Sequence, residues 1–240
     1  MQKVIDVSKW QGNIDYDRVK KSGKVDAVII RSSIGNSTDE KFFEYVNGFD
    51  TVEIPVIGIY HFSHAVTIAD AQREAALIVS NAEKAGLPKS TIIFFDFEYE
   101  SLDNLKSKAS GLSNSELKKV INNITNKFCS MITTAGYKAG VYFNPDFATN
   151  WFESATLDSY VKWLANWGKS KSMTCDIWQY GTTTVDGITN QVDGNESYLD
   201  IAIPTPSPKP KKSNDEIADD VSKGLYGVGE DRKKKLEAEG

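Results

Sequence analysis

The chain has 240 residues, of which 40% are hydrophobic and 11% aromatic, and its formal net charge is −5. This length predicts one large domain, or one domain with a small appendix, whose core needs neither a disulfide nor a metal to fold. The acidic balance argues against nucleic-acid binding through a basic surface. Cys129 and Cys175 form no CxxC pair, and His61 and His64 have no further His or Cys near them in sequence. We therefore expect no disulfide framework, no metal site and no cofactor.

The N-terminal segment MQKVIDVSKW lacks an apolar stretch long enough for a signal peptide, and the sequence has no apolar run of membrane-spanning length. We therefore expect the protein to be made in a cytosol.

Apolar runs of strand length recur along the chain and are rich in Val, Ile and Phe. They lie at 4–7, 25–33, 55–62, 91–97, 138–143, 161–167 and 175–180, with a weaker segment near Gln191. Their hydrophobicity is continuous rather than alternating, which is typical of parallel strands that are covered on both faces.

Amphipathic stretches separate the first strands. They lie at 15–22, 40–49, 67–85 and 113–135. The third ends at Gly86, before Pro88, and the fourth begins with Ser113 followed three residues later by Glu116, a capping box. Five βα units followed by closely spaced strands predict an eight-stranded, modified TIM-like (β/α)5(β)3 barrel with incomplete outer helices. An open Rossmann-type sheet is the alternative, and no GxGxxG follows the first strand to support it.

The composition changes after Ile203. Residues 204–213 read PTPSPKPKKS, which predicts a stiff, extended linker, and residues 214–240 show a charged helical pattern. From Pro204 on there are eight basic and eight acidic residues, so the whole net charge lies on the first 203. We expect a main domain at 1–203, a linker at 204–213 and a short helical tail at 214–240.

Acidic residues stand at the ends of several predicted strands, where βα barrels carry their functional groups. The first strand gives Asp6, the fourth gives Asp96 and Glu98, and the last gives Asp193. Asp96 and Glu98 are two apart, so both side chains leave the same face. Burial and mutual repulsion should raise one pKa and leave the other low, as a general acid and a charged partner require. Each acid has another reading: DxE can be a solvated strand end, and Asp6 and Asp193 can belong to turns.

Aromatic residues accompany these acids. Trp10, Tyr60, Tyr142, Trp167, Trp178 and Tyr180 lie at or near strand ends. Such rings can stack on the apolar faces of sugars, and each single ring can equally belong to the core. Trp163, inside a strand, is predicted to be core.

Several motifs in order resemble glycoside hydrolase family 25, the lysozymes found in many phages of Gram-positive bacteria. They are DVSKWQG (6–12), PVIGIYHFSHA (55–65), FFDFEY (94–99), KAGVYF, KWLANW, DIWQYG and VDGN, so the resemblance covers residues 3–200. It implies a modified βα barrel that cleaves the β-1,4 bond from N-acetylmuramic acid to N-acetylglucosamine in peptidoglycan, with retention. It also implies synthesis without a signal peptide in a host cytoplasm and action on the cell wall after release.

The resemblance further implies residue roles. Glu98 matches the general acid, and Asp96 would orient and stabilise the 2-acetamido group that attacks the anomeric carbon. Asp6 and Asp193 match the other two acids of the subsite, and an older reading makes one Asp a direct nucleophile. As substrate-binding residues we expect Trp10, Tyr60, Tyr142, Trp167, Trp178 and Gln179.

Two segments depart from the family pattern. The second strand reads Arg31-Ser32-Ser33-Ile34-Gly35, with Ile34 in place of an acidic residue, so contacts near that strand end are in doubt. The tail at 214–240 resembles roughly half of a wall-binding repeat, with Tyr226 where Trp is usual and Val228 where Asn is usual. A solvated charged helix is the other reading of this tail.

Two alternative functions stay open. A chitinase-like N-acetylhexosaminidase of family 18 would carry a longer DxxDxDxE run, and Ile92 and Ile93 occupy that region without acids. A non-catalytic wall-binding protein would have lost at least one of the four carboxylates, and all four are present.

Overall fold

The computed structural model describes residues 1–200 and a few single positions between 214 and 236. The chain divides into two units, Met1–Thr205 and Pro206–Gly240. The predicted linker at 204–213 and nearly all of the predicted wall-binding repeat at 214–240 lie outside the described residues. The architecture that follows is that of the first unit.

Eight strands close into a barrel. They are β1 (Gln2–Val7), β2 (Ala27–Ile34), β4 (Val56–Phe62), β5 (Ile92–Asp96), β6 (Lys138–Phe143), β7 (Val161–Ala165), β8 (Ile177–Thr183) and β9 (Val192–Ser197), and the short β3 (Ser37–Thr38) pairs with β2. The order of neighbours is β1-β9-β8-β7-β6-β5-β4-β2, and pairing of β1 with β2 closes the ring. The predicted barrel is confirmed and the open Rossmann-type sheet is wrong, because an open sheet has two unpaired edges.

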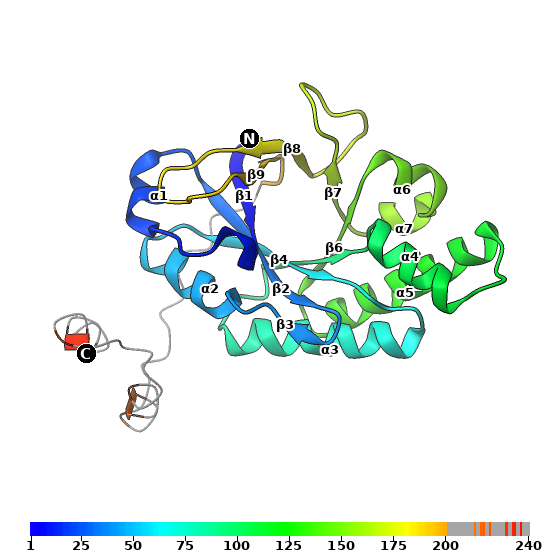
Figure 1. Cartoon of the computed structure of the whole chain (residues 1–240), viewed down its shortest axis with the longest axis horizontal. Coiled ribbons are helices and arrows are strands. Elements are labelled where there is room, and N and C mark those ends of the chain that lie inside the picture. The colour runs from blue at the N-terminus through cyan, green and yellow to red at the C-terminus, as the bar shows by residue number, and fades with distance from the viewer. Residues whose placement is uncertain are drawn as a thin grey trace. The chain divides into compact units, whose positions relative to one another are not determined.

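The helices all precede β7. They are the 3-10 helix η1 (Lys9–Gln11), α1 (Tyr16–Ser22), α2 (Phe42–Thr51), α3 (Ile68–Lys84), α4 (Tyr99–Lys108), α5 (Asn114–Thr134), α6 (Pro145–Asn150) and α7 (Ser154–Asp158). Within residues 1–200 no helix follows β7, and Figure 1 shows loops rather than helices beside β8 and β9. The predicted incomplete outer layer is therefore confirmed. No helix in the described part of the chain is both long and apolar enough to cross a membrane.

The four helices predicted from the sequence begin and end within about two residues of the predicted bounds. The capping box of α5 forms as expected: Ser113 Oγ accepts a hydrogen bond from Glu116 N, and Ser113 N donates to the Glu116 carboxylate. The helices α4, α6 and α7 were not predicted. The long helices α3 and α5 lie side by side on the outside of the barrel (Figure 1).

Strand β9 runs against its neighbours. All other neighbouring barrel strands are parallel, whereas β9 pairs antiparallel with both β8 and β1. The beginning of β9 therefore lies at the same end of the barrel as the carboxyl ends of the parallel strands, and Asp193 pairs directly with Asp6. This end is the mouth of the barrel.

The barrel interior below the mouth is a dry apolar layer, which we name the floor. It consists of Val4, Ala27, Ile29, Ile57, Ile92, Phe94, Trp163 and Ile177. The Phe94 ring meets the Trp163 ring edge-on, with centroids 5.0 Å apart. Gly140 makes room for this pair, because a Cβ there would lie 2.4 Å from the Phe94 ring. The outward-facing strand residues form a second, larger core with the helices.

Candidate active site

A pocket of about 240 Å³ opens at the barrel mouth, and we name it the mouth pocket. Its lining comes from nearly every strand and is mostly polar or aromatic. The lining residues are Asp6, Ser8, Trp10, Gln11, Arg31, Tyr60, Phe62, Asp96, Glu98, Tyr142, Trp163, Gln179 and Asp193. The four carboxylates predicted from the sequence are therefore brought together in one pocket.

Two of the four acids belong to other elements, or to other parts of an element, than the sequence indicated. We expected Asp193 at the carboxyl end of the last strand, but it is the second residue of the antiparallel β9. Glu98 lies two residues beyond Asp96, after β5 has ended, and caps the start of α4. The backbone at Glu98 is still extended, with φ −114° and ψ −168°, so its side chain continues the inward face of β5.

Asp6 is buried and held by two side-chain amides. Its Oδ2 accepts hydrogen bonds from Asn195 Nδ2 at 2.8 Å and from Gln179 Nε2 at 3.1 Å. The pKa of Asp6 is raised to about 7, chiefly by burial and also by the nearby Asp193 charge, while the two amide hydrogen bonds oppose the rise. Asp6 can therefore hold a proton at a pH where an exposed Asp is ionised.

Asp96 is buried at the end of β5, and its Oδ1 has no hydrogen-bond partner among the described residues. Burial raises its pKa well above the ordinary value, the charges of Glu98 and Asp6 add to the rise, and Arg31 opposes it. A buried carboxylate oxygen without a partner is costly, and active sites are where such groups are kept. Asp96 thus has an oxygen available to a group that enters the pocket.

Glu98 is half-buried at the edge of the pocket. Burial raises its pKa, the nearby Tyr142 hydroxyl lowers it, and the charges of Asp193 and Glu100 raise it. The four acids therefore titrate as a group in which charge on one disfavours charge on the others. Such a site can keep one carboxyl protonated while another is ionised, as acid–base catalysis requires.

Arg31 of the pocket lining belongs to a buried ion pair. Arg31 Nε donates to Asp39 Oδ2 at 2.7 Å, and both side chains are buried. Sequence reasoning missed this pair, although it noted that Ile34 replaces an acid near this strand end. The structure brings Asp39, which follows β3, to that region, and its carboxylate partners Arg31.

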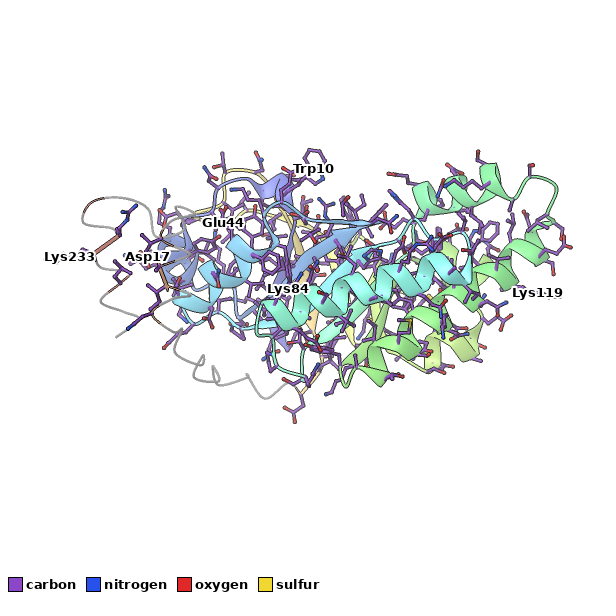
Figure 2. The ribbon with its side chains drawn as sticks, turned by 90° about the horizontal axis from the view of Figure 1, so that it is seen from below. Trp10, Asp17, Glu44, Lys84, Lys119 and Lys233 are labelled. Carbon is purple, nitrogen blue, oxygen red and sulfur yellow. The ribbon has the colours of Figure 1, made fainter. Side chains whose placement is uncertain are left out.

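Aromatic rings line the mouth pocket at two depths. Tyr60 and Tyr142 both meet the Trp163 ring edge-on, with centroids 5.8 and 4.8 Å away, so Trp163 is core as predicted and also the bottom of the pocket. Trp10 lines the pocket and is 69% exposed. Trp167 is 62% exposed and is not in the pocket lining, but its Nε1 donates to Gln179 Oε1 at 3.2 Å. Figure 2 shows Trp10 projecting from the ribbon at the barrel mouth, available to a ligand.

Trp178 is a correction to the predicted site. It is buried in the outer core, its Nε1 donates to Asn166 O at 2.8 Å, and it does not line the mouth pocket. Its neighbour Gln179 points inward instead, because successive strand residues face opposite sides. Gln179 is buried and accepts hydrogen bonds from Tyr142 OH and Trp167 Nε1 while it donates to Asp6.

Asn195 is a site residue that sequence reasoning missed. Its Nδ2 donates to Asp6, and its Oδ1 accepts from Trp163 Nε1 at 2.8 Å. The signal that could have found it is spacing, since Asn195 stands two residues after Asp193 on the same strand face. Together, Asn195 and Gln179 fix the orientation of the Asp6 carboxylate.

The two histidines lie apart from the acids of the pocket. His61 is fully buried outside the barrel wall, with Nδ1 2.7 Å from Ser33 Oγ and Nε2 3.1 Å from Glu74 Oε2. This arrangement links β2, β4 and α3 and is closed to solvent. Among the described residues no group of three or more His, Cys, Asp or Glu is placed to hold a metal ion.

Comparisons with known proteins agree with this geometry. A model of the glycosyl hydrolases family 25 matches residues 5–188. Lysozyme M1 of Streptomyces globisporus is 27% identical over an aligned stretch of 203 residues that covers 80% of this chain and 66% of that protein, so the chain spans just under two thirds of this relative.

Solved structures give the same result for the fold. The modular autolysin LytC of Streptococcus pneumoniae superposes with a TM-score of 0.69 at 23% identity, over 81% of this chain and 46% of that one. The catalytic domain of endolysin ply40, from a bacteriophage of Listeria monocytogenes, gives 0.62 at 28% identity, over 83% and 94%. Since the family model covers most of the sequence, the chain belongs to glycosyl hydrolases family 25.

Proposed function

We propose that this chain is a lysozyme that hydrolyses the β-1,4 bond from N-acetylmuramic acid to N-acetylglucosamine in the peptidoglycan of Gram-positive bacteria. The observation that carries the proposal is the meeting of Asp6, Asp96, Glu98 and Asp193 in one pocket at the barrel mouth of a family 25 chain. The relative named Lysozyme M1 supports the activity.

Glu98 is the proposed general acid. It is the acid at the edge of the pocket, where a glycosidic oxygen can reach it, and burial raises its pKa, which favours its protonated form. It would donate that proton to the leaving oxygen of N-acetylglucosamine as the bond from C1 of muramic acid breaks. Glu98 would then take a proton from the water that completes the reaction.

Asp96 is the proposed partner of the 2-acetamido group. Its unpartnered buried oxygen can accept a hydrogen bond from the acetamido N–H, and that contact favours attack of the acetamido oxygen on C1. The intermediate is an oxazolinium ion, which water opens with overall retention. The reading in which one Asp attacks C1 directly gives the same stereochemistry.

Asp6 and Asp193 would face the same sugar from the opposite wall. Asp193 pairs with Asp6 across β9 and β1, so both acids come from adjacent strands. Either acid, when ionised, opposes ionisation of the other acids and would stabilise positive charge that develops at C1. Trp10, Tyr60 and Tyr142 of the pocket lining would supply ring faces or hydroxyls for the sugars, and the exposed Trp167, which donates to Gln179, would supply a further ring.

The decisive experiment replaces Glu98 with Gln, which keeps the shape of the side chain and removes its proton donor. We expect release of new reducing-end muramic acid from purified Gram-positive peptidoglycan to fall by about 10²–10⁴-fold. Mass spectrometry of the muropeptides identifies the bond, and anomer analysis of the first products checks retention. Glu83→Gln, on the exposed end of α3, is the matched control and should keep full activity.

The melting temperature of both variants should stay near that of the parent chain. Full lytic activity of Glu98→Gln would overturn the proposal. Cleavage of chitin oligomers in preference to peptidoglycan would favour the chitinase-like alternative. Tight binding to walls with no new reducing ends from the parent chain would favour a non-catalytic wall-binding protein.

A further inference from the structure

A second pocket, of about 390 Å³, opens at the same end of the barrel, and we name it the side pocket. The loops after β2 and β4, the first turns of α3 and one face of α4 form its wall. The α4 face presents Glu100, Asn104 and Lys108, which are four residues apart and therefore lie in one row along the helix. The mechanism proposed above makes no use of this pocket.

The side pocket is a neighbour of the mouth pocket. Phe62 lines the mouth pocket, and its ring meets the ring of His64 edge-on with centroids 5.6 Å apart. His64 in turn lines the side pocket. At the start of α4, Glu98 belongs to the mouth pocket and Glu100 to the side pocket. A substrate seated at the acids can therefore extend past Phe62 into the side pocket.

Part of the polar lining is already occupied by protein contacts. Asp70 caps the start of α3 and pairs with Arg73. Glu74 is buried and accepts hydrogen bonds from Ser63 Oγ and His64 N. These two carboxylates give the wall negative charge and rigidity, and they have little capacity left for a ligand.

Other side chains in the lining remain able to bind a ligand. The side chains of Asn36 and Lys108 form no hydrogen bond or ion pair with any residue of the described part of the chain. Asn104 donates one hydrogen bond, to His64 O at 3.1 Å, which leaves its amide oxygen as an acceptor. The Glu100 carboxylate is 3.4 Å from His64 Nε2 and is mostly exposed. The pocket thus offers an ammonium, a carboxylate and two amides.

This chemistry suits a peptide better than a sugar. The rings that can stack on sugar faces line the mouth pocket or its rim, whereas the only ring in the side-pocket lining is the imidazole of His64. A peptide presents backbone amides and terminal or side-chain charges, which match amide and charged side chains. In peptidoglycan, muramic acid carries a short peptide on its lactyl group.

We propose that the side pocket binds the peptide carried by muramic acid, so that the enzyme favours glycan strands that keep their peptides. Lys108 would pair with a carboxylate of the peptide, Glu100 with an amino group, and Asn36 and Asn104 with backbone amides. The inference rests on the proposed function, because it takes peptidoglycan as the substrate of the mouth pocket.

The test compares two substrates that differ only in the peptide: soluble glycan strands that carry their peptides, and the same strands after an amidase has removed them. We expect Lys108→Met and Asn36→Ala each to raise KM about threefold to tenfold on the peptide-bearing strands, as loss of a charged or polar contact at a partly exposed site predicts. On the stripped strands both variants should match the parent chain within about twofold.

Lys106→Met is the matched control, since Lys106 lies on the same helix but outside the pocket, above the Trp151 ring. It should leave KM unchanged on both substrates. Equal losses of the pocket variants on both substrates would mean that the side pocket contacts glycan, and no loss on either would mean that it binds neither; both results overturn the inference. Failure of the proposed function looks different, because the parent chain would then cleave neither substrate.

Discussion

The floor and the mouth of the barrel belong to the same inward face and differ completely in chemistry. On each of three strands, a floor residue and a mouth residue are two positions apart. The pairs are Val4 and Asp6 on β1, Phe94 and Asp96 on β5, and Ile177 and Gln179 on β8. Because residues two apart share a strand face, one face supplies both layers.

The comparison shows that the buried apolar floor is one reason why the acids above it have raised pKa values. The floor is closed to water, so the mouth carboxylates are solvated from one side only. Burial is the largest cause of the raised pKa at Asp6, Asp96 and Glu98 alike. Apolar packing below therefore offsets the destabilising burial of acids and also sets their protonation.

The strongest way to break this comparison is Phe94→Ala. The ring fills the space left by Gly58 and Gly140 and packs on Trp163. Its removal should lower the free energy of unfolding by about 3–5 kcal/mol, measured by urea denaturation, because a buried cavity is left. Water that enters this cavity would also lower the apparent pKa values of the pH–activity profile.

Phe43→Ala on α2 serves as the control, since Phe43 is 38% exposed and lies on the outer layer. We expect it to cost about 1 kcal/mol or less. If Phe94→Ala costs no more than Phe43→Ala, the floor is not the packed layer that the comparison assumes.

The strands that form the floor could largely be predicted from the sequence, because buried parallel strands appear as continuous apolar runs. The helices with caps and long apolar faces were predicted as well. The short α4 has only Leu102 and Leu105 as buried apolar residues, too few for a periodic signal. The direction of β9 was not readable, because a hydrophobic pattern carries no direction and Val192 is the only apolar residue of that strand.

The acids of the mouth could be predicted from the sequence, together with Trp10, Tyr60, Tyr142 and Gln179 of its lining. An acid at the end of a buried apolar run is not needed for packing. That argument predicted that Asp6, Asp96 and Glu98 lie at the mouth, and all three line the mouth pocket. Asn195 and the Arg31–Asp39 pair escaped it, because their partners come from strand pairings that sequence spacing does not reveal. Trp178 was misplaced because its segment has two candidate faces, and the inward one carries Gln179.

Asp6→Asn tests the comparison through the pH dependence of the free energy of unfolding. The pKa of Asp6 is raised to about 7 in the folded protein from an ordinary value of 3.8. Between these values the folded protein keeps a proton that the unfolded chain releases, so this group lowers stability as pH rises from 4 to 7. The variant should therefore gain on the order of 4 kcal/mol relative to the parent at pH 7, and little at pH 4.

Urea denaturation of both proteins at pH 4 and pH 7 measures this difference. The Asn oxygen can still accept the bonds from Asn195 and Gln179, so the geometry is kept. Asp103→Asn, on the exposed face of α4, is the control and should follow the parent at both pH values. A variant whose stability changes with pH as the parent's does would show that Asp6 is ionised in the folded protein.

The smallest expected effect is at the outer rim of the mouth. There the comparison predicts that a side chain contributes to substrate binding and not to the stability of the fold. Trp10 is 69% exposed, so Trp10→Ala should change the free energy of unfolding by about 0.5 kcal/mol or less. If its ring stacks on a sugar, KM on peptidoglycan should rise about threefold to tenfold, the equivalent of about 0.6–1.4 kcal/mol, with kcat nearly unchanged.

Tyr198→Ala is the matched control, since Tyr198 is 40% exposed just beyond the other end of β9, away from the mouth. A KM that moves equally in both variants would mean that exposed aromatic area in general, rather than its place at the mouth, holds the glycan. A KM that moves in Trp10→Ala alone, with stability intact, separates the rim from the floor, where the same kind of truncation removes stability first.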